Sequence, residues 1–285
     1  MSTLPIGNPR PSAEPAAPPV PAPVVASEGW GVVHVFFHLR RELLDDPTHA
    51  ADGFVKQVTA FEAREDYQAL TFSILGQKAD LGLMLLGPDL GALDGFTVEL
   101  AASPLGAALL PAASYVSLTE LSEYASTRED EARRLAEEEG LEASSAEHEN
   151  ALAAFDARTA AYAEHRLHPR LPYHRVLSFY PMSKRRGERD NWYRLPFAER
   201  RRLMGGHARV GRSYRGRVLQ LITTSAGLDD WEWGVTLLAD DPKAITDIVY
   251  EMRFDEVSAR YADFGPFVTG LVLDPEALMG RLGLR

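Results

Sequence analysis

Cysteine is absent from this chain of 285 residues, which excludes disulfides, thiolate metal sites and iron–sulfur clusters. Long apolar runs are absent as well: the run from Leu81 to Gly87 is far shorter than the roughly 20 residues that a bilayer-spanning helix needs. The sequence also lacks the Gly-rich motifs that hold nucleotide phosphates. We therefore expect a cytoplasmic protein that has no membrane span and carries out no nucleotide chemistry.

The beginning of the chain is rich in proline and poor in residues that pack. Residues 1–28 contain eight prolines. This composition is typical of disorder, and the prolines interrupt any apolar segment that could resemble a signal peptide. We predict a disordered tail over residues 1–28, followed by enough chain for one or two domains.

Charge is distributed unevenly along the chain. Residues 165–217 carry 15 Lys and Arg against three acidic residues, a net charge of +12, so the rest of the chain carries −23. A basic region inside an acidic protein favours a discrete anionic ligand over nucleic acid. A solvated basic surface is the alternative explanation.

Two parts of the sequence share one order of elements. Residues 30–39 and 175–180 are rich in β-branched and aromatic residues, which predicts strands. Residues 72–89 and 219–242 each consist of a strand pattern, a Gly-bearing turn, a second strand pattern and a proline. A helix should follow the second copy, since Asp241 can cap it and apolar residues recur at helical spacing through Val257.

We predict an α+β protein of two β-α-β-β-α-β units, with antiparallel sheets packed with helices. The stretch between the two units is rich in Ala and Glu, so it should form helices that break near Gly140. The predicted boundaries are 29–121 for the N-terminal half, 122–166 for an acidic helical connector and 167–285 for the C-terminal half. A solvated connector without a function is the simplest explanation for residues 122–166.

The basic region places a phenol, a lysine and an imidazole near one another in the sequence. Tyr180 should end a strand, and Pro181 should open a loop that carries Lys184. His207 follows two glycines and should lie just past the end of a helix, where a neutral imidazole can ligate iron. A core tyrosine, a solvent-facing lysine and a structural histidine are the alternatives.

These motifs, together with residues 227–235 (GLDDWEWGV) and 248–259 (IVYEMRFDEVSA), resemble the coproheme decarboxylases of the chlorite-dismutase-like superfamily. The resemblance covers residues 30–270. It implies two ferredoxin-like units that form a dimeric α+β barrel, a homopentamer, and a porphyrin site in the C-terminal half. It also implies a reaction in which hydrogen peroxide drives the decarboxylation of two propionates of iron coproporphyrin III (coproheme) to vinyl groups, giving haem b.

The resemblance also implies roles for individual residues. His207 would ligate the iron, Tyr180 would form the radical that attacks the substrate, and Lys184 would lie beside the reacting propionate. The other implied porphyrin-binding residues are Arg166, Met182, Ser183, Trp192, Gln220, Trp233, Arg253 and Ser258. A ferrochelatase that hands over the substrate is the implied transient partner.

Two other functions fit parts of the pattern. Chlorite dismutases place an arginine over the distal face of the iron, whereas Gln220 stands in this sequence, and a neutral amide would stabilise hypochlorite poorly. A porphyrin carrier would use His207 and the basic region but would give Tyr180 and Lys184 no special role. Substitution of Tyr180 therefore distinguishes an enzyme from a carrier.

Overall fold

The computed structural model describes residues 22–143 and 145–285. Most of the predicted disordered tail, residues 1–21, lies outside the described part. The prediction is wrong for the end of that tail: the Val24 N–H donates to Asp89 Oδ1 at 2.7 Å, and Val25 forms a β-bridge with Asp89. The sequence pattern missed this attachment because a distant segment provides it: Asp89 accepts from Val24, and the Leu90 N–H donates to the Val24 carbonyl at 2.9 Å.

The first half of the chain has the predicted order of elements. It consists of β1 (Gly31–Leu39), η1 (Arg41–Leu43), α1 (Pro47–Glu62), β2 (Gln68–Ile74), β3 (Leu81–Gly87), α2 (Leu90–Ala101), η2 (Gly106–Ala108) and β4 (Leu109–Thr119). The strands pair antiparallel in the order β4-β1-β3-β2. This is the arrangement of a ferredoxin-like unit.

The second half repeats that arrangement. It consists of β5 (Val176–Lys184), η3 (Trp192–Arg194), α5 (Phe197–Ser213), β6 (Leu219–Thr224), β7 (Trp233–Ala239), α6 (Pro242–Met252), α7 (Glu256–Tyr261), β8 (Ala262–Phe264), β9 (Val268–Val272) and α8 (Pro275–Arg281). The pairing order β6-β7-β5-β9 matches the first half, and β8 extends the pairing along β5. The second unit therefore has the same topology as the first.

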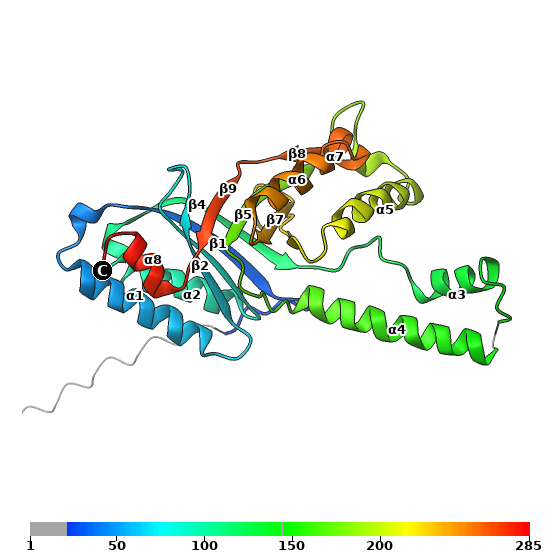
Figure 1. The fold of residues 1–285 in the computed structure, drawn as a ribbon, viewed down its shortest axis with the longest axis horizontal. Helices are drawn as coiled ribbons and strands as arrows, with labels where there is room; N and C mark the ends of the chain where they lie inside the picture. Colours follow the sequence, from blue (N-terminus) through cyan, green and yellow to red (C-terminus); the bar gives the residue numbers. More distant parts are fainter. Residues whose placement is uncertain (1–21, 144) are drawn as a thin grey trace, which may run out of the picture.

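The two halves form one closed sheet. β4 pairs with β6 at one junction and β2 pairs with β9 at the other, so every neighbour around the barrel is antiparallel (Figure 1). The predicted α+β fold with two ferredoxin-like units in one barrel is confirmed. The interior of the barrel is mostly apolar and contains Phe36, Phe72 and Phe179, with His34 as a buried polar residue beside them.

The connector between the halves is a helical arm. α3 (Arg128–Glu137) and α4 (Ala146–Leu167) project from the barrel as a hairpin, and Gly140 takes a left-handed φ of 69° in the turn between them (Figure 1). Asp130 at the start of α3 forms an ion pair with Arg201 of α5. The predicted helices and the break near Gly140 are confirmed, whereas the boundaries 29–121, 122–166 and 167–285 remain a prediction.

β5 is longer than the sequence predicted. The strand continues to Lys184, so the expectation that Tyr180 ends it and that Pro181 opens a loop is wrong. Pro181 O accepts from the Gly265 N–H at 2.8 Å, and the proline nitrogen faces the same side as its carbonyl. On that side the partner of β5 changes from β9 to β8, so the absent N–H costs no ladder hydrogen bond.

His207 lies inside α5 and not past its end, which corrects a second prediction. Neither Gly205 nor Gly206 has a positive φ, so neither forms the left-handed cap that ends many helices. Beyond these glycines α5 continues to Ser213, and Val210 packs against the second-half sheet. Packing of the last two turns therefore outweighs the low helix propensity of two glycines.

Two predictions on the last third of the chain need a similar correction. The helix capped by Asp241 is present, but it ends at Met252, and Val257 belongs to α7 because Asp255 caps a new helix there. α8, which the sequence placed in the C-terminal half, packs on the first half, where Leu278 and Met279 are buried in the core under α1 and α2. Within residues 22–143 and 145–285, no helix has the length and apolarity to cross a membrane.

Candidate functional site

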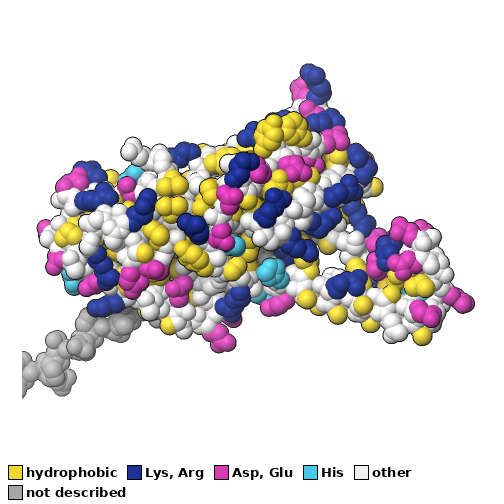
Figure 2. Space-filling view, viewed as in Figure 1, with side chains coloured by type: hydrophobic (Ala, Val, Ile, Leu, Met, Phe, Trp, Pro, Cys, Tyr) yellow, Lys and Arg dark blue, Asp and Glu magenta, His cyan; other side chains and the backbone are white. Residues whose placement is uncertain are grey.

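The helix-covered faces of the two halves differ in how they are filled. In the first half this face is fully buried by apolar side chains such as Phe54, Phe61 and Phe96. In the second half, several residues between the sheet and helices α5 and α6 are only partly buried, among them Tyr180 and Met182. The second half therefore has the less completely packed face, and the basic side chains gather over this part of the molecule (Figure 2).

β5 presents three of the predicted residues to this face. Alternation along the strand places Tyr180, Met182 and Lys184 on one side. Trp233 lies directly opposite Met182 on β7, so its side chain is on the same side. The sheet thus brings four predicted porphyrin-binding residues together.

Tyr180 is held between aromatic rings. Its ring stacks on Phe267 with centroids 4.3 Å apart and meets Phe264 edge-on at 5.9 Å. Burial raises the pKa of its phenol to about 12, and nearby Arg253 opposes this shift. The phenol is therefore neutral at pH 7, so its oxidation to a radical releases a proton as well as an electron.

Lys184 is buried to 9% exposure at the end of β5. Its Nζ lies 4.5 Å from the centroid of the Trp192 ring, which is itself buried against α5 and α7. Burial lowers the pKa of Lys184 to about 8, while Asp255 and Glu232 oppose the shift. Since Nζ forms no ion pair with any described residue, the ammonium is available to an anionic ligand.

His207 is oriented by a carboxylate. Its Nδ1 lies 2.8 Å from Asp255 Oδ2, and the Ser258 N–H also donates to this oxygen at 3.3 Å. Burial raises the pKa of Asp255, but the hydrogen bond and the charge of His207 outweigh it, so the pKa is lowered overall. When Nδ1–H donates to Asp255, Nε2 carries the lone pair, which is the arrangement that metal-ligating histidines adopt.

A second group of predicted residues lies where α4 meets the sheet. Trp233 Nε1 donates to Glu120 Oε1 at 2.9 Å, and Arg166 Nη2 donates to the Ile222 carbonyl at 3.3 Å. Burial raises the pKa of Glu120, against the effects of Trp233 and Arg166. Within the described residues Arg166 Nε is buried and has no hydrogen-bond partner, so it is a donor that a ligand could satisfy.

Gln220 and Arg253 border the face on opposite sides. Gln220 Nε2 donates to the Gly211 carbonyl of α5 at 2.9 Å, which holds the amide against the helix. Arg253 follows the last turn of α6 and lines a pocket of about 570 Å³ together with Phe267. Both residues therefore adjoin the face that carries Tyr180.

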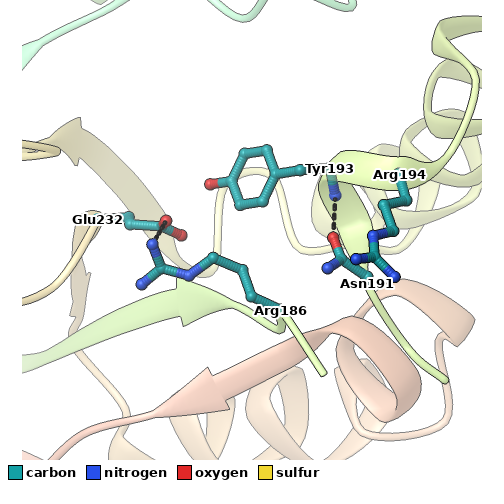
Figure 3. A pocket seen from close by; sticks show the side chains of 5 residues that line it. All are labelled: Arg186, Asn191, Tyr193, Arg194 and Glu232. Atoms are coloured by element: carbon teal, nitrogen blue, oxygen red, sulfur yellow. Dashed lines mark hydrogen bonds and ion pairs between the residues drawn. The ribbon is translucent and has the colours of Figure 1, made fainter. Parts of the chain in front are cut away.

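Ser183 does not join this arrangement. The alternation of β5 turns it to the other side of the strand, where its Oγ accepts from the Glu232 N–H at 3.2 Å. Glu232 also lines a pocket of about 540 Å³ outside the face, where its carboxylate points toward Arg186 and lies near Tyr193 (Figure 3). The assignment of Ser183 to the porphyrin site is not supported by this geometry.

Three acidic partners of the predicted site residues were missed by sequence reasoning. Asp255, Glu120 and Glu232 contact His207, Trp233 and Lys184, respectively. Asp255 has the sequence signature of a helix N-cap, but its pairing with a histidine 48 positions away depends on how α5 and α7 pack. No spacing rule identifies such partners.

The residues at this face fit an anionic metalloporphyrin. Nε2 of His207 could ligate iron, because a carboxylate lies behind Nδ1. Lys184, Arg166 and Arg253 are cationic side chains at or beside this face. Charge-assisted hydrogen bonds to carboxylates contribute about 1.5 to 3 kcal/mol each. Two observations carry this fit: among the described residues, Arg166 Nε is buried without a hydrogen-bond partner, and the Lys184 ammonium lies over the Trp192 ring without an ion pair.

Comparison with known proteins gives consistent results. The chain matches the family model described as Chlorite dismutase over residues 43–273. It is similar to a coproheme decarboxylase from Thermus thermophilus, with 38% identity over 273 residues that cover 93% of this chain and 98% of that protein. A coproheme decarboxylase from Staphylococcus saprophyticus is 37% identical over 265 residues, which cover 90% of this chain and 97% of that protein.

Solved structures agree at the level of the fold. A haem-binding protein from Thermus thermophilus superposes with a TM-score of 0.73 at 38% identity, over 90% of this chain and 96% of that one. A variant of chlorite dismutase from Candidatus Nitrospira defluvii gives 0.67 at 14% identity, over 90% and 96% of the two chains, and at this identity it shows only the shared fold. The family match and the relatives together show that this chain belongs to the chlorite dismutase family.

Proposed function

We propose that this protein is a coproheme decarboxylase, which converts two propionates of iron coproporphyrin III to vinyl groups with hydrogen peroxide as the oxidant and so makes haem b. The observation that carries the proposal is the presence of Tyr180, Lys184 and the His207–Asp255 pair around one face of the second half. The names of the relatives from Thermus and Staphylococcus support the same substrate.

The reaction balances with one peroxide for each propionate. The side chain –CH2–CH2–COOH loses CO2 and two hydrogen atoms and becomes –CH=CH2. The peroxide accepts these two electrons and two protons and becomes two water molecules. The bound iron porphyrin supplies the oxidising power once peroxide has reacted with it.

The protein positions the groups that exchange electrons and protons. His207 would ligate the iron through Nε2, and Lys184, Arg166 and Arg253 would bind propionates. Tyr180 would lose an electron and its proton together and would then abstract a hydrogen atom from the β-carbon of the propionate beside it. Breaking the bond to the carboxyl carbon with loss of one more electron releases CO2 and leaves the vinyl group.

The remaining implied residues have supporting roles in this proposal. Met182 and Trp233 would cover the porphyrin from the sheet, and Trp192 would support the Lys184 ammonium from behind. Gln220 would provide a neutral amide on the distal side, and Ser258 would bind a propionate. The homopentamer, the cytoplasmic location and the transient contact with a ferrochelatase belong to the same proposal and rest on resemblance.

The test is to add coproheme to the purified protein, titrate hydrogen peroxide, and follow the porphyrin by mass spectrometry. Two successive losses of one CO2 and two hydrogens are expected, each requiring one peroxide. Tyr180→Phe should bind coproheme but form no vinyl group, with rates lowered at least a hundredfold, about 2.7 kcal/mol in activation free energy. Tyr214→Phe is the matched control because Tyr214 is in the same core cluster and loses only a hydroxyl that donates to Glu251.

Other outcomes would identify the alternatives. Tight coproheme binding without any change of mass would indicate a porphyrin carrier, for which Tyr180→Phe has no effect. Rapid release of O2 from chlorite by the haem-loaded protein would indicate a chlorite dismutase. If Tyr180→Phe decarboxylates as fast as the wild type, the tyrosyl mechanism is wrong.

A further inference from the structure

Glu232 holds the end of β5 in place through three hydrogen bonds. Its backbone N–H donates to the Met182 carbonyl at 3.1 Å and is within 3.2 Å of Ser183 Oγ. Its side chain returns to the same strand, where Oε2 accepts from the Lys184 N–H at 2.7 Å. One residue just before β7 therefore contacts three consecutive residues of β5.

The carboxylate of Glu232 is enclosed on its other side. Its side chain is 12% exposed, and Arg186 Nη1 lies 3.9 Å from Oε1 (Figure 3). The loop that carries Arg186 is itself fixed, since Arg186 forms a β-bridge with Asn191 and the Tyr193 N–H donates to Asn191 Oδ1 at 3.1 Å. Glu232 thus connects a rigid loop outside the site with the strand that carries Lys184.

The contact between Glu232 and Lys184 is made by the backbone of the lysine and not by its ammonium. The Lys184 side chain leaves the strand on the opposite side and places Nζ over the Trp192 ring. β8 pairs with residues 182–184 along one edge of β5, whereas β7 pairs with β5 only as far as Met182. Without Glu232, the Lys184 N–H would have no partner on the β7 side, and the end of the strand would be free to shift.

We propose that Glu232 is a positioning residue, which fixes the backbone of Lys184 so that the ammonium meets the reacting propionate. This inference rests on the proposed function. The lysine side chain is long and flexible. The position of its ammonium therefore depends on the position of the Lys184 backbone and on the Trp192 ring that the ammonium covers. Misplacement of a reacting partner by about 1 Å can lower a rate by about a hundredfold.

Two substitutions separate the hydrogen bond from the charge. Glu232→Gln keeps an oxygen that can accept from the Lys184 N–H, whereas Glu232→Ala removes the acceptor. Asp230→Ala is the matched control, since Asp230 is an exposed acid on the same loop. At saturating coproheme, Glu232→Ala should lower the decarboxylation rate about tenfold or more, while Glu232→Gln and Asp230→Ala stay within about threefold of the wild type. The Kd for coproheme should change by less than about threefold in Glu232→Gln and Asp230→Ala, which keep the position of the Lys184 ammonium.

Labelling of lysines provides a readout that does not depend on turnover. The chain has four lysines, and Lys56, Lys78 and Lys243 are exposed, so they serve as internal references for an amine reagent. In the porphyrin-free full chain, Glu232→Ala should raise labelling of Lys184 several-fold relative to these references. Glu232→Gln should leave it close to the wild-type value.

The results have distinct meanings. The inference is overturned if Glu232→Ala keeps the wild-type rate, if Glu232→Gln is as slow as Glu232→Ala, or if Lys184 labelling does not change. If Glu232→Ala does not fold, Glu232→Gln decides the outcome. The inference is then overturned if Glu232→Gln is as stable as the wild type but decarboxylates more slowly. An inactive wild type would refute the proposed function, whereas the labelling comparison would still decide the role of Glu232.

Discussion

Lys184 differs from the other three lysines in its surroundings and not in its chemistry. It is buried, its ammonium lies over an indole ring, and its pKa is lowered to about 8, whereas Lys56, Lys78 and Lys243 are exposed. A lysine in such a place is poised between charged and neutral forms near physiological pH. The fraction of Lys184 that is charged therefore changes with pH near the physiological range, and measurements of ligand binding can detect this change.

Coproheme binding should weaken as pH rises above about 8. Below this pH Lys184 is charged and attracts a propionate; above it the free protein must take up a proton before the ion pair forms. A bound propionate raises the pKa of Lys184, so the decrease continues toward the usual range of lysine. Absorbance titrations between about pH 7 and pH 10 measure this directly. Lys184→Met should bind about tenfold more weakly at pH 7 and lose this pH dependence.

His34, inside the barrel, is a second buried basic residue, and burial keeps it neutral. Its Nε2 lies 3.0 Å from Thr236 Oγ1, its ring stacks on Phe179 at 4.1 Å, and desolvation lowers its pKa to about 3. Nδ1 is buried and has no hydrogen-bond partner within the described residues. This histidine stays neutral in the folded protein, so it is not a candidate for proton transfer at pH 7.

Acid should destabilise the protein partly through His34. Because the pKa of this base is lower in the folded state than in the unfolded state, the unfolded chain binds the extra proton between pH 6.5 and pH 3. The contribution of neutral His34 to the free energy of unfolding is therefore fully present above about pH 6.5, and it is lost as the pH falls toward 3. The loss between pH 7 and pH 4 amounts to about 3 kcal/mol. Urea unfolding should show that His34→Gln lacks this part of the pH dependence; an unchanged difference between the two pH values would contradict the assignment.

At the scale of helices and strands, local sequence signals identified elements better than they identified the ends of those elements. The caps Asp241 and Pro242 and the two paired-strand patterns predicted α6 and the repeat correctly. The predicted end of β5 was wrong because a proline is tolerated where the partner strand changes. The predicted end of α5 was wrong because tertiary packing stabilises the helix beyond Gly205 and Gly206.

α5 should become more stable when Gly205 is replaced by alanine. Gly205 is exposed, its φ is not positive, and an added Cβ would meet nothing within 4 Å. Gly205→Ala should raise the free energy of unfolding by about 0.5 to 1 kcal/mol, chiefly because it restricts the unfolded chain. Thermal unfolding of Gly227→Ala provides the contrast, since its φ of 85° predicts destabilisation. A loss of stability in Gly205→Ala would mean that this glycine is needed for close packing.

Sequence patterns identified site residues that share one strand but not the contacts between residues of different elements. Tyr180, Met182 and Lys184 alternate along one strand, so a strand that reached Lys184 would have placed them on one face from sequence alone. His207 has its acid partner, Asp255, on a different helix, and Arg166 reaches the site from the connector. Contacts of this kind depend on how elements pack, which a single sequence does not encode in any local pattern.

On the scale of the whole molecule, each half depends on the other for the integrity of its sheet. β4–β6 and β2–β9 pairs close the barrel, and α8 returns from the second half to the core of the first. The face of the second half that carries Tyr180 is therefore attached to a scaffold that includes the first half. We expect the two halves to unfold together.

Leu278→Ala tests this dependence. Leu278 lies on α8 and is fully buried in the core of the first half, so its truncation should cost about 2 to 5 kcal/mol. Urea unfolding followed by far-UV circular dichroism should remain a single transition at a lower midpoint. Leu228→Ala removes an exposed leucine and should change stability by less than about 0.5 kcal/mol. Two separate transitions in Leu278→Ala would show that the halves are independent.

The helical arm has a practical consequence. The covalent connection between the halves passes through α3 and α4, yet the halves are also held by strand pairs at both junctions and by α8. A protease that cuts the turn at Gly140 would produce two fragments that remain interlocked in one barrel. A denaturing gel would then show two bands from a particle that elutes as intact protein and still contains every residue of the proposed site.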